Sequence, residues 1–153
     1  MRLVGGIDPG KTGALVVLDG DGRPVCVKVM PENVHDLVSI IEAYRSADWA
    51  IEKVSPFQGA SLTSTWTFAE GFGVLKGIFG ALKVKYTLVP PRVWQAPIHL
   101  GADKYAPPKV RSLEVARRLF PTCNFLATEK SKVAHDGIVD AFLIAEFMRR
   151  SLR

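Results

Sequence analysis

The sequence predicts an α/β fold, with a mixed five-stranded sheet whose first three strands are antiparallel and whose faces are covered by helices. Three observations favour this class: short apolar runs joined by tight turns open the chain, two helix-to-strand units follow, and amphipathic helical segments close it. A length of 153 residues and a hydrophobic content of 48% suit a single domain over residues 1–153 with a buried core.

The first third of the chain is expected to form an antiparallel meander. Its strands are predicted at Leu3 to Ile7, Gly13 to Leu18 and Val25 to Val29. The turn Asp19-Gly20-Asp21-Gly22 joins the last two, because Asp-Gly pairs adopt positive φ at little cost. Asn33 is then expected to cap a helix with apolar positions at Leu37, Val38, Ile40 and Ile41, and a buried strand is expected at Trp49 to Glu52.

The rest of the chain is predicted to be mainly helical. A long helix is expected at Ser61 to Leu82, where Gly71, Gly73, Gly77 and Gly80 lower the helix propensity and permit close packing. Lys85 to Val89 is the predicted fifth strand, ended by Pro90-Pro91, and Lys104 to Pro108 is a basic loop. The last two helices are predicted at Val110 to Phe120, stopped by Pro121, and at His135 to Ser151.

The charge and the cysteine content restrict the class of protein. A formal net charge of +5 and a pI near 9.4 favour a polyanionic partner, because each neutralised phosphate releases counterions. Cys26 and Cys123 are too few for a disulfide framework, and no Cys/His cluster has zinc spacing. The short apolar run at the start predicts neither a signal peptide nor a membrane span, so we expect a cytoplasmic protein.

Four carboxylates stand at the ends of, or inside, apolar runs. Asp8 and Glu52 each end a predicted strand, and Asp136 and Asp140 lie one turn apart on the last helix. Taken singly, Asp8 can be a turn residue, Glu52 the partner of a lysine, and Asp136 a cap or a complement to the helix dipole. Taken together, they are expected to converge at one edge of the sheet, where hard oxygen ligands suit Mg²⁺ or Mn²⁺.

One motif matches the pattern of a nucleotide-binding loop but lacks the structural context that such a loop requires. Residues Gly5 to Thr12 match the pattern of a nucleotide-binding P-loop, which requires a strand before it and a helix after it. Here a second strand follows instead of a helix, and an acid in the middle of the loop would repel phosphates. The sequence therefore predicts no nucleotide cofactor.

The residues that carry these carboxylates resemble a known family. The chain resembles the RuvC-type Holliday junction resolvases, and its bacteriophage branch in particular. The matching segments are Ile7-Asp8-Pro9-Gly10 with Gly13, Glu52 at a strand end, Leu113 to Pro121, and His135-Asp136-Gly137 followed by Asp140-Ala141. The last two acids are commonly three residues apart in the family. In this sequence the residue three before Asp140 is Gly137, so the second acid must be Asp136, four residues before Asp140.

The resemblance implies an RNase H-like fold, a homodimer, and cleavage of four-way and other branched DNA that depends on Mg²⁺ or Mn²⁺. Two ions per site would be held by Asp8, shared between them, with Glu52, Asp136 and Asp140. His135 is a candidate for proton transfer or ion binding, or a capping or surface histidine. The expected DNA contacts are Lys104, Lys109, Arg111, Lys130 and Lys132, with Phe57 as the aromatic at the junction centre.

Two other functions are compatible with parts of the sequence. A junction-binding protein that does not cut would share the basic surface, although a full set of acids facing phosphates argues against it. An actin- or sugar-kinase-like phosphate turn would share the strand-turn-strand around Asp8, although such proteins need two domains around the nucleotide.

Overall fold

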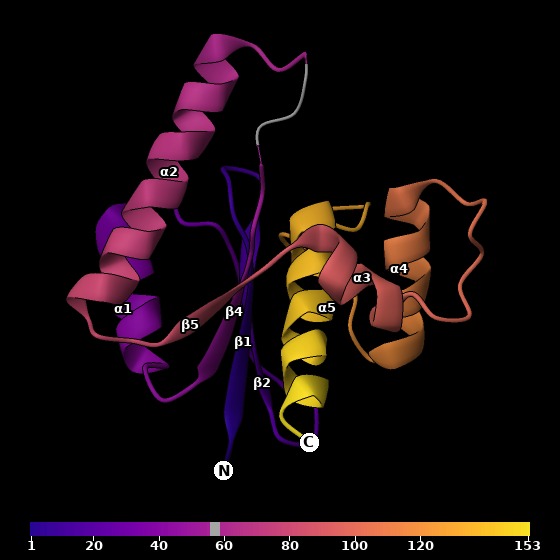
Figure 1. Ribbon diagram of the computed structural model, residues 1–153. Coiled ribbons are helices and arrows are strands. Elements are labelled where there is room, and N and C mark those ends of the chain that lie inside the picture. Colours follow the sequence, from indigo (N-terminus) through magenta and orange to yellow (C-terminus); the bar gives the residue numbers. More distant parts are fainter. Residues whose placement is uncertain (56–58) are drawn as a thin grey trace.

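The computed structural model describes residues 1–55 and 59–153, and within them a single mixed five-stranded sheet lies between two layers of helices (Figure 1). The strand order is β3-β2-β1-β4-β5. β1 pairs antiparallel with β2 and β2 with β3, while β1 pairs parallel with β4 and β4 with β5. The strands are β1 (Leu3–Asp8), β2 (Ala14–Asp19), β3 (Pro24–Val29), β4 (Asp48–Glu52) and β5 (Tyr86–Val89). The predicted fold class is confirmed.

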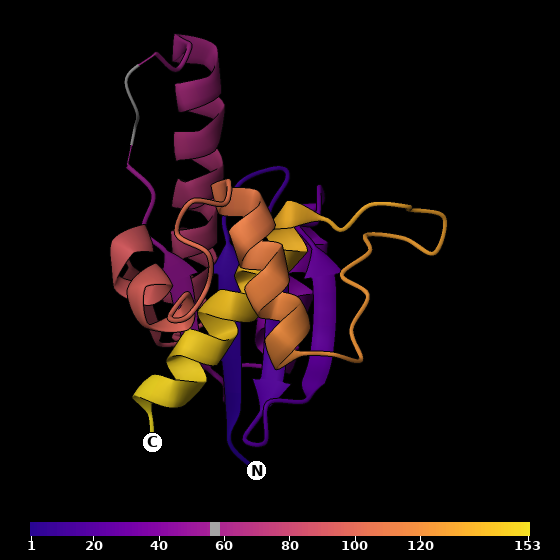
Figure 2. The same cartoon turned by 90° about the vertical axis from the view of Figure 1, so that its right-hand side faces the viewer.

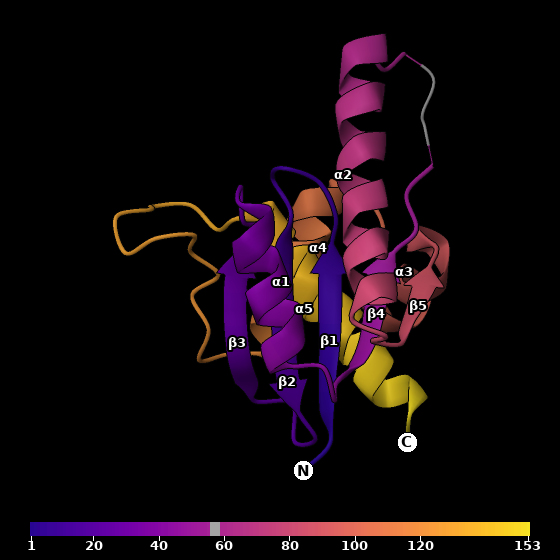
Figure 3. The same ribbon diagram turned by 90° about the vertical axis from the view of Figure 1, so that its left-hand side faces the viewer.

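Helices cover both faces of this sheet. α1 and α2 lie on one face and α3, α4 and α5 on the other (Figures 1 and 3). The bounds are α1 (Val34–Ala43), α2 (Leu62–Ala81), α3 (Pro91–Ile98), α4 (Pro108–Leu119) and α5 (Asp136–Ser151). Asn33 caps α1 as predicted, since its side chain accepts a hydrogen bond from the backbone N–H of His35. No helix of the described ranges has the length and apolar composition needed to cross a membrane.

α3 is the element that the sequence analysis missed. The sequence predicts only the end of a strand at Pro90-Pro91, but Pro91 is the first residue of a helix. Proline is favourable there, because its fixed φ is helical and the first backbone N–H of a helix has no intrahelical partner. The helix buries Trp94 completely against the α4–α5 layer.

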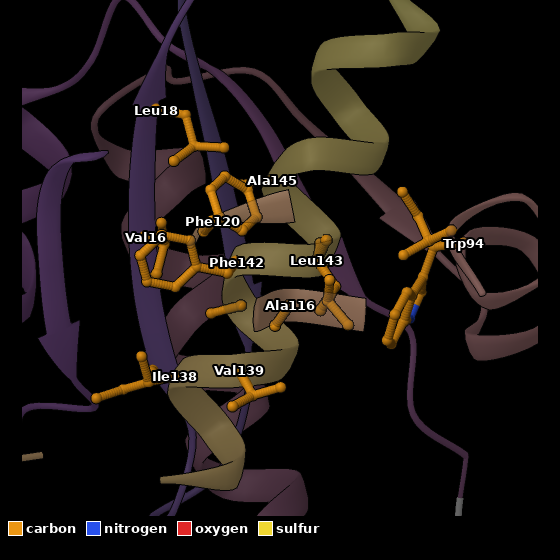
Figure 4. Close-up of a cluster of buried hydrophobic side chains, with 14 of the residues drawn as sticks. Val16, Leu18, Trp94, Ala116, Phe120, Ile138, Val139, Phe142, Leu143 and Ala145 are labelled. Atoms are coloured by element: carbon orange, nitrogen blue, oxygen red, sulfur yellow. The ribbon is translucent and has the colours of Figure 1, made fainter. Parts of the chain in front are cut away.

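The alternation of side chains along the strands separates two hydrophobic cores. Ile7, Leu15 and Ile51 point toward α1 and α2, whereas Val4, Val16 and Ala50 point toward α5. Figure 4 shows the second core, in which β2 packs against the aromatic side chains Phe120 and Phe142.

α5 lies directly on the backbone of β1, and Figure 2 shows it crossing the sheet. A Cβ atom at Gly6 would come within 2.3 Å of the Ala141 carbonyl oxygen and the Ala145 nitrogen. The glycine at this position therefore lets the helix approach the strand more closely than any side chain would permit. This close approach fixes where the first turn of α5 lies relative to the end of β1.

The N-terminal half of α2 projects beyond the sheet (Figures 1 and 3). Its side chains Leu62 and Trp66 are 90% and 74% exposed. A Cβ atom at any of the four α2 glycines would meet nothing within 4 Å among the described residues. The close packing that we expected these glycines to permit is therefore absent from the described part of the chain, and the face of α2 that carries Leu62, Trp66, Gly73 and Gly77 is open.

Candidate active site

Asp8 and Glu52 lie side by side at the carboxyl edge of the sheet. Their strands are parallel neighbours, and the residues just before them, Ile7 and Ile51, are register partners. Because side chains alternate along a strand, Asp8 and Glu52 point to the face opposite Ile7 and Ile51, which is the face covered by α5. The sheet itself thus aims two carboxylates at the last helix.

Gly137 brings the start of α5 against the β1–β2 turn. A Cβ atom at Gly137 would lie 2.3 Å from the Thr12 carbonyl oxygen and 2.8 Å from Gly13 Cα. A side chain at this position would collide with backbone, so an acid cannot stand three residues before Asp140. The four-residue spacing from Asp136 to Asp140 follows from this contact, and it keeps both carboxylates on one face of the helix.

The carboxylates are close enough to perturb one another. Burial, followed by repulsion from Asp140, Glu52 and Asp136, raises the pKa of Asp8 from 3.8 to about 8. Burial and repulsion from Asp140 raise the pKa of Glu52 to about 7, and Glu52 is only 9% exposed. A shared buried charge of this kind is unfavourable unless a cation accompanies it.

Asp140 stands between this cluster and two helices on its other side. Burial raises its pKa to about 6; a hydrogen bond from Ser112 and the charge of Lys109 act in the opposite direction, while repulsion from Asp136 adds to the rise. Asp140, Ser112, Lys109 and Asp136 line a small pocket of about 90 Å³ between α3, α4 and α5. Lys109 Nζ lies 2.6 Å from Asp136 Oδ2, and the Asp136 side chain is 53% exposed. Asp136 is therefore the least enclosed of the four carboxylates.

The donor set fits a divalent cation in its chemistry. The oxygens of Asp8, Glu52 and Asp140 are hard ligands, and burial together with neighbouring carboxylates raises the pKa of each. Among the described residues, no three His, Cys, Asp or Glu side chains gather closely enough to form a finished ligand shell.

His135 has a structural role at this position. Its Nδ1 atom accepts a hydrogen bond of 3.2 Å from the backbone N–H of Ile138, so the ring caps α5. This is the capping alternative that the sequence left open for His135. The cap uses the lone pair of Nδ1, which leaves Nε2 as the ring nitrogen available for any further role.

The predicted DNA contacts are not equivalent. Lys104, Lys130 and Lys132 are exposed on the loops that precede α4 and α5, and only Lys109 among these four lysines lines the pocket beside Asp136 and Asp140. Arg111 instead donates from its guanidinium to the carbonyl oxygens of Lys104 and Ala106, which ties down the loop before α4. Phe57, expected at the junction centre, lies outside the described residues.

Sequence reasoning did not find the residues that support Asp140 from α3 and α4. Ser112 was not predicted as a site residue. Gln95, which lines the same pocket as Ser112 and Asp140, lies on α3, the helix that the sequence did not predict. The signal for α3 was present, since a proline pair followed by Arg92-Val93-Trp94 is compatible with a helix start. Contact with Asp140 leaves no signal in a single sequence.

The metal-free protein is expected to lose stability as the pH rises from about 4 to 8. The folded chain holds a proton on Asp8, whose pKa is about 8, that the unfolded chain releases near 3.8, so folding is disfavoured progressively across this range. Glu52 and Asp140 act in the same direction. In EDTA, the thermal midpoint of the wild type should fall over this range relative to that of an Asp8→Asn variant, and Mn²⁺ should cancel the difference. If the difference in thermal midpoint between the two proteins did not change with pH, this result would contradict the burial of Asp8.

Taken together, the strand order, the helix layers and the carboxylates at one sheet edge define an RNase H-like fold. The solved structures similar to this chain include T. thermophilus RuvC in complex with a Holliday junction substrate, with a TM-score of 0.68, 16% identity, and coverage of 99% of this chain and 96% of that chain. Another Thermus thermophilus RuvC structure gives a TM-score of 0.65 at 19% identity, with coverage of 98% and 96%. No family model matches the sequence, and no curated protein matches it. At these identities the likeness shows the fold, as the sequence resemblance predicted.

Proposed function

We propose that this protein is a metal-dependent endonuclease that resolves four-way DNA junctions and other branched DNA. The observation that carries the proposal is the convergence of Asp8, Glu52 and Asp140 from two strands and one helix onto one buried edge, where each has a raised pKa. The RNase H-like fold, shared with a RuvC that was solved on a Holliday junction substrate, supports the same class of reaction.

The carboxylates would hold two Mg²⁺ or Mn²⁺ ions, with Asp8 shared between them and Glu52, Asp140 and Asp136 completing the two ligand sets. When bound, such ions activate water and stabilise the charge that develops on a phosphodiester during hydrolysis. Asp8 and Glu52 are positioned by adjacent strands, which fixes their spacing with little freedom. Lys109 holds Asp136 at the rim, and this contact must loosen if Asp136 is to bind an ion.

The exposed lysines would contact DNA phosphates and position the duplex arms without reading their sequence. Lys104, Lys109, Lys130 and Lys132 are all exposed, and the net charge of +5 favours such contacts. For Arg111 the contribution would be to hold the Lys104 loop, because its guanidinium already donates to two carbonyl oxygens of that loop.

Incubation with a synthetic four-way junction tests the proposal. Purified protein should introduce paired nicks in the presence of Mg²⁺ or Mn²⁺ and none in EDTA, and linear duplex of the same sequence should be cut far less. Retained binding without nicking in either metal would favour the non-cleaving binding protein. Hydrolysis of ATP without nicking would favour the actin- or sugar-kinase-like alternative.

Paired nicking requires two active sites, and the open face of α2 would supply the dimer contact. Along this face Leu62, Trp66, Gly73 and Gly77 recur at helical spacing, and the glycines expose the helix backbone. A helix with small residues on one face can approach a second copy closely. Trp49 and Trp94 are fully buried, so Trp66 is an exposed tryptophan whose fluorescence can report the contact.

A lysine at Gly77 is expected to dissociate the dimer, because a long charged side chain would separate the two helices. Gly71→Lys is the matched control: it adds the same charge to the same helix at another exposed glycine that lies off this face. Sedimentation should give a monomer for Gly77→Lys and a dimer for Gly71→Lys, with a blue-shifted Trp66 emission only in the dimer. Identical behaviour of the two variants would place the dimer contact elsewhere.

A further inference from the structure

Two residues outside the carboxylate cluster connect Asp140 to the helices behind it. Ser112 lies on α4, is 6% exposed, and lines the same small pocket as Asp140, where its hydroxyl lowers the pKa of that carboxyl. The same hydroxyl oxygen lies 3.3 Å from Nε2 of His99, the residue that ends α3. The His99 ring packs against Trp94 in an edge contact, with centroids 5.6 Å apart and planes at 73°. Together these residues lead from a buried tryptophan to the pocket that Asp140 lines.

The chemistry of the groups fixes the direction of the hydrogen bonds. An ionised carboxylate can only accept, so in a hydrogen bond between Ser112 and Asp140 the hydroxyl proton points to the carboxylate. The oxygen of Ser112 then offers only lone pairs to His99, whose Nε2 must carry the hydrogen. Burial and the nearby Arg111 charge lower the pKa of His99, so the ring is neutral near pH 7 and has one N–H to place.

We propose that His99 and Ser112 act as positioning residues for Asp140, with His99 Nε2–H donating to Ser112 Oγ and the Ser112 hydroxyl donating to the carboxylate. Repulsion between Asp140 and its neighbours Asp8 and Asp136 favours rotation of the carboxylate away from the cluster. A buried donor with its own fixed partner opposes that rotation, in the way that outer partners orient metal ligands. The effect on catalysis rests on the proposed nuclease function. The proposed hydrogen bonds from His99 to Ser112 and from Ser112 to Asp140 are expected in the protein without metal as well.

The tautomer of His99 tests the chain without any activity measurement. Long-range ¹H–¹⁵N correlation spectra of the wild-type protein in EDTA at pH 7 should show a neutral His99 ring protonated at Nε2. In Ser112→Ala the ring should lose this preference, because its hydrogen-bond partner is gone. A His99 ring protonated at Nδ1 in the wild type would overturn the proposal.

Three variants test the consequence for the site. Ser112→Ala should weaken Mn²⁺ binding, measured by calorimetry, and lower kcat on a four-way junction, each by about 10- to 100-fold, with KM unchanged. His99→Phe, which keeps an aromatic ring beside Trp94 but removes the donor, should lose a similar factor. His99→Gln, whose amide can still donate, should recover most of it. Ser151→Ala, which removes an exposed hydroxyl bonded to its own helix at Phe147, should behave as wild type.

The outcomes separate this inference from the proposed function. Wild-type Mn²⁺ affinity in a folded Ser112→Ala, or equal losses in His99→Phe and His99→Gln, would overturn the positioning role even if the wild type cuts junctions. If the wild type cuts nothing but binds Mn²⁺ in a manner that depends on Ser112, and His99 carries its proton on Nε2, the positioning chain is supported and the nuclease assignment fails.

Discussion

Asp8→Asn is expected to abolish nicking of a four-way junction, with a loss of at least about 10³-fold in rate, equivalent to about 4 kcal/mol of transition-state stabilisation. Asp8 ends the central strand and is the carboxylate that the other three all perturb. An amide has the same shape, but it cannot supply the negative charge that two divalent ions require. Single-turnover cleavage at saturating Mg²⁺ measures the loss.

Binding and stability should change in the opposite direction. Removing a buried charge relieves repulsion, so Asp8→Asn should melt at the same temperature as the wild type or higher in EDTA at pH 8, and it should bind the junction equally well or more tightly. Asp36→Asn removes the same charge from the exposed first turn of α1 and should leave cleavage intact. Equal loss of cleavage and binding in Asp8→Asn would argue against a catalytic role for this carboxylate.

Gly137→Ala is expected to destabilise the protein by about 2–3 kcal/mol and to impair cleavage, although alanine has the higher helix propensity. The added methyl group would lie 2.3 Å from the Thr12 carbonyl oxygen, and backbone cannot yield as a flexible side chain does. Relief requires the first turn of α5 to move away from the β1–β2 turn, and this carries Asp136 and Asp140 away from Asp8. Urea denaturation gives the change in the free energy of unfolding.

Gly71→Ala is the control variant, for which we expect a change in the free energy of unfolding of the opposite sign. A Cβ atom at this α2 position meets nothing within 4 Å among the described residues, so the same substitution should stabilise the helix by about 0.5–1 kcal/mol and leave cleavage unchanged. If both variants were stabilised, the close contact between α5 and the β1–β2 turn would be wrong, and with it the explanation of the four-residue spacing between Asp136 and Asp140.

Local patterns in the sequence were sufficient for most of the elements. Short apolar runs bounded by turn residues predicted the strands, Asn33 was predicted to cap α1, and Ser61, the predicted start of the long helix, is the N-cap of α2. α3 was missed because Pro91 is compatible both with the end of a strand and with the start of a helix, and the burial of Trp94 decides between them. Burial depends on residues far away in the chain, so a local pattern does not contain it.

The sequence by itself determined that acids end two strands and recur one helical turn apart on the last helix, because chain order and periodicity are local properties. Only the tertiary structure decided which of these acids are enclosed, since enclosure depends on how α5 lies on β1 through Gly6 and Gly137. The same packing brought Ser112 to Asp140, paired Lys109 with Asp136 and used His135 as a cap. These contacts join residues from different elements, so their distances are set by the packing of whole helices against the sheet.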